Sequence, residues 1–108
     1  MKMKVTLKEL LIMLDIILFA HVRFHRAEYS ALLGTDDESR RVLSEKINNY
    51  ITDILSDNKK TYKIDFTDAD LINLIGFCNH FEFYEEYEKR GRFNRNDIKT
   101  LKERLEKL

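Results

Sequence analysis

Hydrophobic side chains recur at helical spacing in four stretches of the chain, and polar residues mark where each stretch begins. Thr6 and Glu9 form a capping-box sequence just before an apolar run from Leu10 to Ala20. In such a box the Thr hydroxyl and the Glu carboxylate each accept a backbone N–H that the first helical turn leaves without a partner. We therefore predict a first helix over residues 7–33, which ends before Gly34.

Three further helices are predicted in the same way, from a cap residue followed three positions later by an acid. The cap and acid pairs are Thr35 with Glu38, Thr67 with Asp70, and Asn94 with Asp97. Apolar residues at helical spacing follow each pair. The resulting helices cover residues 36–56, 68–90 and 95–107.

Two short segments, residues 1–5 and residues 61–66, alternate apolar and polar side chains as strands do. If they paired, they would form a minor two-stranded β ribbon, within one chain or between two. Isolated two-stranded pairs are only marginally stable. The sequence therefore favours the alternative, an extended linker and a frayed terminus.

The helices and their short connections predict an all-α, four-helix bundle-like single domain over residues 1–108. The run from Leu10 to Ala20 is apolar on nearly every side, so it needs cover on most of its surface. Three shorter helices of one subunit can supply that cover, and a second copy of the chain would supply it more easily. We therefore expect a homodimer, with the bundle closed either within one subunit or between two.

The composition argues against a protein that binds nucleic acid or another polyanion with its whole surface. Lys and Arg number 19 and Asp and Glu number 19, so the formal net charge is zero. The one cysteine, Cys78, can form no intrachain disulfide, which points to a reducing compartment and a cytoplasmic protein. Abundant Lys, Ile and Asn without proline accompany AT-rich genomes, such as those of many bacteria and phages.

The apolar run is too short to span a bilayer, which takes about 20 residues. The segment that begins at His21 is also unlike a signal-peptide cleavage site.

Asp15 is the most unexpected residue of the apolar run. A carboxylate among apolar residues needs a cation or a donor. Lys8 shares its helical face, so we interpret Asp15 as solvent-facing or ion-paired. The alternative is a partner-binding or catalytic carboxylate.

A metal site is one hypothesis for the first helix. His21, His25 and Glu28 lie one turn apart on one helical face, and two imidazoles at this spacing can chelate a metal. His80 could complete such a site. The simpler interpretation is a polar stripe where the helix leaves the core, and we predict no resident metal or cofactor.

Basic residues surround the turn at Gly91. Arg90, Arg92, Arg95 and Lys99 lie there, with Phe93 among them, and residues 90–108 carry seven basic against three acidic side chains. Arginines can hold phosphates while an aromatic ring stacks on a base. The alternative is a solvated helix end whose positive charges suit the helix dipole.

The third predicted helix is aromatic on more than one face. Phe81 falls in line with Leu74 and Cys78 and should be buried, whereas Phe83 points in nearly the opposite direction. Exposed aromatics beside acids are typical of a protein-binding patch. The residues of this predicted patch are Glu82, Phe83, Tyr84, Glu86 and Tyr87.

No motif of a catalytic site or of a nucleotide-binding loop is present in the sequence. We therefore predict a non-enzymatic, protein-binding regulator or inhibitor, of the kind found among adaptors, antitoxins, immunity proteins and phage host-modulating proteins. The alternatives are a nucleic-acid-binding regulator that uses the basic turn at residues 90–102, and a metal-binding helical protein.

Overall fold

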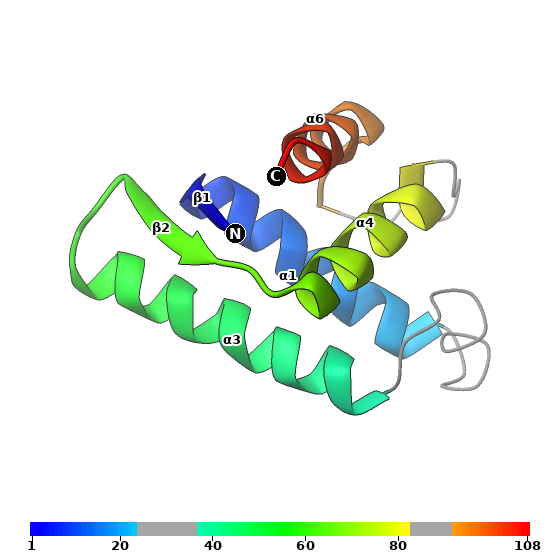
Figure 1. Cartoon of the computed structure of the whole chain (residues 1–108), viewed down its shortest axis with the longest axis horizontal. Helices are drawn as coiled ribbons and strands as arrows, with labels where there is room; N and C mark the ends of the chain where they lie inside the picture. The colour runs from blue at the N-terminus through cyan, green and yellow to red at the C-terminus, as the bar shows by residue number, and fades with distance from the viewer. Residues whose placement is uncertain (24–36, 83–91) are drawn as a thin grey trace.

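The structure, a computed structural model, describes residues 1–23, 37–82 and 92–108 (Figure 1). These residues form two strands and four helices. In chain order they are β1 (Lys2–Thr6), α1 (Leu7–Arg23), α3 (Asp37–Ser56), β2 (Thr61–Asp65), α4 (Asp68–Glu82) and α6 (Arg95–Glu106).

The predicted starts of three helices are confirmed, and each has the geometry of a capping box. At α1 the backbone N–H of Thr6 donates to Glu9 at 3.0 Å, and the N–H of Glu9 donates to the Thr6 hydroxyl at 3.2 Å. Thr67 and Asp70 do the same for α4, at 3.0 and 3.1 Å. Asn94 with Asp97 completes the set at α6. The predicted cap at Thr35 and the predicted helix ends at residues 33 and 90 lie outside the described residues.

The two alternating segments do pair, which makes the interpretation as a linker and a frayed terminus wrong. β1 and β2 form an antiparallel two-stranded sheet within one chain, with Met3 opposite Ile64 and Val5 opposite Tyr62. Met3, Val5 and Ile64 are buried. The ribbon is stable here because its inner face packs into the core, which an isolated ribbon cannot do.

Helix α1 contributes heavily to the core and contacts β1, α3, α4 and α6. It runs behind β2 and the start of α4 in the view of Figure 1. Its buried side chains are Leu10, Ile12, Met13, Ile16 and Ile17. The predicted stripes of the other helices also enter the core, with Leu43, Ile47 and Ile54 from α3, Leu74, Phe77 and Cys78 from α4, and Ile98, Leu101 and Leu105 from α6.

The described chain is therefore mostly helical, with a small antiparallel sheet. The more specific prediction of a four-helix bundle is not confirmed. In Figure 1 α1 and α3 run across the page, whereas α6 is strongly foreshortened, so α6 crosses α1 and does not run alongside it. Consistent with that crossing, α1 contacts α6 near its own first turn through residues from both ends of α6.

The acid at the third position of each capping box also binds a cation from another helix. Glu9 of α1 binds Arg104 of α6, Asp70 of α4 binds Lys46 of α3 at 2.6 Å, and Asp97 of α6 binds Lys8 of α1 at 3.1 Å. Each of these carboxylates thus accepts the backbone N–H of the cap residue of its own helix and also joins that helix to a second one. Local capping and tertiary packing depend on the same three side chains.

The Lys46–Asp70 pair should be strongly coupled, because its side chains are only 24% and 10% exposed. We expect Lys46→Met and Asp70→Asn each to lower the free energy of unfolding by roughly 1–3 kcal/mol, since either leaves a mostly buried charge without its partner. The double variant should lose at least about 1 kcal/mol less than the sum of the two. Urea denaturation measures all three values.

The matched control is Arg41→Met, which removes the exposed pair with Glu38 on the same helix. This variant should leave the unfolding midpoint nearly unchanged, because solvent-exposed ion pairs contribute little. Strict additivity of the two single variants at Lys46 and Asp70 would show that the pair does not couple α3 to α4.

Candidate functional site

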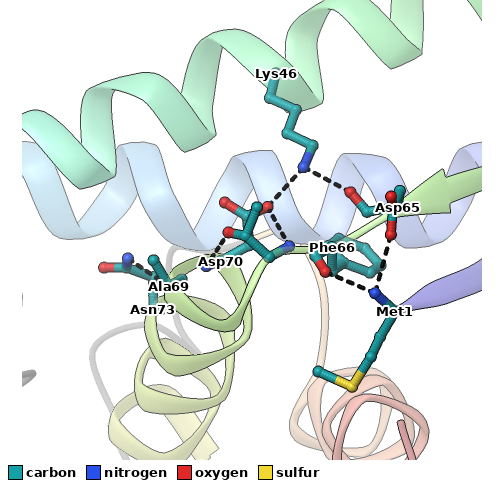
Figure 2. Close-up of polar contacts among 8 residues, drawn as sticks. Met1, Lys46, Asp65, Phe66, Ala69, Asp70 and Asn73 are labelled. Atoms are coloured by element: carbon teal, nitrogen blue, oxygen red, sulfur yellow. Dashed lines mark hydrogen bonds and ion pairs between the residues drawn. The ribbon is translucent and has the colours of Figure 1, made fainter.

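A cluster of polar contacts lies where β2 leads into α4 (Figure 2). The Lys46 ammonium donates to the Asp65 carbonyl and to the Asp70 carboxylate, each at 2.6 Å. The α-amino group of Met1 donates to the Asp65 carboxylate at 2.9 Å and to the Phe66 carbonyl at 3.0 Å. Residues from α3, α4 and β2 therefore meet in one network with Met1, which precedes β1.

The contacts of this junction indicate a structural role. Asp70 Oδ2 accepts from Lys46 and also from the backbone N–H of Thr67 at 3.0 Å. The Lys46 chain passes over the ring of Phe66, with its ammonium 5.9 Å from the ring centroid. A general acid or base needs a proton that it can exchange with a substrate, whereas here the charged groups are engaged with one another and with the backbone.

A shallow groove runs along the neighbouring flank of α3. Its described lining is Val42, Glu45, Lys46, Asn49, Tyr50 and Asp53, and its volume is about 450 Å³. The lining side chains belong to a single helix, so the groove is open. Its described lining contains no serine, cysteine or histidine that could pair as a nucleophile and a base.

The tyrosines beside the groove are packed on each other. The rings of Tyr50 and Tyr62 lie 6.0 Å apart at 59°. The Tyr62 hydroxyl donates to the Asp57 carboxylate at 3.2 Å, and this hydrogen bond raises the pKa of Tyr62. The hydrogen bond joins β2 to the residue that follows α3, and so holds the connection between these two elements.

The outer face of α4 exposes apolar surface. The Ile72 side chain is 55% exposed. Ala69 and Asn79 on the same side are exposed as well, and Ile75 and Gly76 are half-buried. When neighbouring residues extend the apolar area around an exposed aliphatic side chain, the surface is typical of an interaction site.

The residues of the predicted protein-binding patch follow this face of α4 directly in the sequence. Phe83, Tyr84, Glu86 and Tyr87 lie outside the described residues. Glu82 is the last residue of α4, and its side chain lies outside the described part. Ile72 was not predicted as a site residue, although its position off the apolar line of Leu71 and Leu74 was visible in the sequence.

The predicted basic residues are only partly placed. Arg92, Arg95 and Lys99 are exposed, and Arg90 lies outside the described residues. Arg95 and Lys99 are four positions apart in α6 and therefore share one helical face. Phe93, in contrast, packs against the core. The half-buried ring therefore helps to anchor the start of α6, and stacking of Phe93 on a base stays a prediction.

The predicted metal ligands fall largely outside the described structure. His25 and Glu28 lie in the segment between α1 and α3 that is not described, and the side chains of His21 and His80 are not described either. Within residues 1–23, 37–82 and 92–108 no three His, Cys, Asp or Glu side chains are grouped so that they could hold a metal ion. The metal hypothesis stays a prediction.

Asp15 is half-buried, between solvent and the core. Lys8, which shares its helical face, forms its ion pair with Asp97 of α6. The sequence suggested Lys8 as a neighbour of Asp15 within one helix, and the contact across helices could not be seen in it.

Comparisons with known proteins identify no relative. No protein-family model matches the chain, and searches of curated proteins and of solved structures also gave no match. Of the helices in the described part of the chain, none combines the length and the hydropathy needed to cross a membrane.

Stability should respond to acid through Asp65. The hydrogen bond and charge of the Met1 ammonium lower the pKa of Asp65 in the folded state. A lowered folded-state pKa means that the contribution is complete above the ordinary aspartate pKa of about 4 and is lost as the pH falls through the folded value.

We therefore expect Asp65→Asn to be less stable than the parent near neutral pH and to approach it as the pH falls below about 4. Thermal unfolding followed by circular dichroism from pH 7 to acid measures this difference in midpoint. A difference that is constant over the whole range would exclude the ion pair as its cause.

Proposed function

We propose that this protein acts by binding another protein, as a non-enzymatic regulator or inhibitor, and that the outer face of α4 forms part of its contact surface. The observation that carries the proposal is the exposed Ile72, with Ile75 beside it, on a helix that leads directly into the aromatic and acidic residues 82–87. Apolar centres with polar surroundings are typical of protein interfaces.

The anchoring of α4 supports this role. The helix is fixed at its first turn by the capping box at Thr67 and by the Lys46–Asp70 pair. Its inner face is buried through Leu74, Phe77 and Cys78. A surface held in place before binding loses less conformational entropy when the partner arrives, and affinity gains accordingly.

The test compares two exposed aliphatic side chains. Ile72→Asp should reduce the amount of bound partner at least about tenfold, as expected for a central contact residue. Leu55→Asp is the matched control, because Leu55 is 61% exposed near the end of α3, away from α4. Partner recovered from a lysate on each immobilised variant is quantified by mass spectrometry. Equal recovery on Ile72→Asp and on the parent would place the surface elsewhere.

A second variant tests whether the surface extends beyond α4. Phe83→Ala should also lower partner recovery while the helical circular dichroism stays that of the parent. If Ile72→Asp weakens binding and Phe83→Ala does not, the contact is confined to α4.

A second candidate function rests on α6. Arg92, Arg95 and Lys99 are exposed at its start, where cations can contact a nucleic-acid backbone. If this surface binds nucleic acid, the logarithm of the affinity should fall linearly with the logarithm of salt, at about 0.7–0.9 per phosphate contacted. Fluorescence anisotropy with a labelled oligonucleotide measures the slope. Arg92→Ala with Arg95→Ala should flatten it, and an unchanged slope would exclude these two residues.

A further inference from the structure

A leucine stripe runs along one side of α1, at the margin of the core. It consists of Leu7, Leu11, Leu14 and Leu18. The first three are half-buried and rest on the edge of the core, and Leu18 is 49% exposed. Successive members are four, three and four positions apart.

This spacing is that of a helix-pairing seam. Apolar residues that alternate between three and four positions repeat every 3.5 residues on average, and this keeps them in line when two helices pack side by side. The stripe is about 16 Å long at 1.5 Å per residue. The opposite side of α1 is already occupied, because Leu10, Met13 and Ile16 are completely buried in the subunit.

One flank of the leucine stripe carries opposite charges. Lys8 and Asp15 lie next to the leucines, about two helical turns apart on the same side of α1. The Lys8 side chain is 63% exposed and Asp15 is half-buried. In paired helices, the residues at these flanking positions determine the partner and the orientation.

We propose that the leucine stripe is the seam of a homodimer, in which α1 of one protomer packs antiparallel against α1 of its partner. A two-fold axis between Leu11 and Leu14 brings Lys8 of each protomer toward the partner's Asp15. In a parallel pair this flank of one helix would instead face the other flank of the partner, the side of Leu10 and Ile17, so Lys8 and Asp15 would not meet. The charge pattern therefore selects the antiparallel arrangement, in which one surface is complementary to itself.

Lys8 can keep its contact within the subunit when the two helices pair. Lys8 already binds Asp97 at 3.1 Å. Its ammonium has three N–H donors and can hold a second carboxylate at the same time.

A seam of three turns is small beside ordinary stable interfaces, which bury about 1,600 Å². The dimer should therefore be reversible and should dissociate on dilution. This inference does not depend on the proposed function of α4.

Sedimentation equilibrium of the full chain from about 5 to 500 µM tests the dimer, since a small interface requires high concentrations. We expect a monomer–dimer equilibrium in the parent and a dissociation constant at least about tenfold larger for Leu18→Glu. Ile72→Asp should dimerise like the parent. A parent that stays monomeric at the highest concentration would overturn the proposal, as would an unaffected Leu18→Glu.

A charge exchange tests the orientation separately. In a dimer of Lys8→Glu, each of the two contacts sets an acid against an acid. In a dimer of Asp15→Lys, each contact sets a cation against a cation. Each variant should therefore dimerise at least about tenfold more weakly than the parent. In an equimolar mixture both contacts become opposite in sign, and dimers should return to nearly the parental level. Circular dichroism confirms that each variant is folded. Folded variants whose mixture shows no recovery would overturn the antiparallel seam.

Discussion

Three carboxylates near helix starts hold the described structure together. Glu9, Asp70 and Asp97 each cap the helix in which they lie and each bind a cation from another helix. A capping side chain is already oriented by its own backbone, so little further freedom is lost when the cation docks on it. Because the capped helix end is rigid, the cation bound to it fixes the second helix relative to the first. The aliphatic side chains between the helices therefore pack in one defined arrangement.

The same principle explains how the sheet and α6 are attached. Arg104 binds Glu9 and also donates to the Lys4 carbonyl at 2.7 Å, so one guanidinium joins α6 to the strand and to the helix that follows it. On the other side of the molecule, Lys46 joins α3 to the end of β2 and to α4. The outer face of α4 and the leucine stripe of α1 both lie on elements that are fixed in this way.

Much of this fold could be predicted from the sequence, because its strongest signals are local. The caps at Thr6, Thr67 and Asn94 and the apolar spacing of their helices depend on residues a few positions apart, and both were correct. The sheet was underestimated, since its stability comes from burial against helices that a strand pattern does not reveal. The cations could not be foreseen, because Lys46 and Arg104 are 24 and 95 positions from their acids. For the site, the exposure of Arg92, Arg95 and Lys99 was predictable, whereas the contact of Phe93 with the core depends on packing that the sequence does not show.

The long separation between Glu9 and Arg104 has a consequence for the order of folding. The two side chains that join α1 to α6 are 95 positions apart in the chain. Closing so long a loop costs more conformational entropy than joining α1 to α3, which lies nearer in the chain. We therefore expect the contact between α1 and α6 to form late, after α1 has packed on α3. We also expect the domain to fold more slowly than a helical protein built from local contacts.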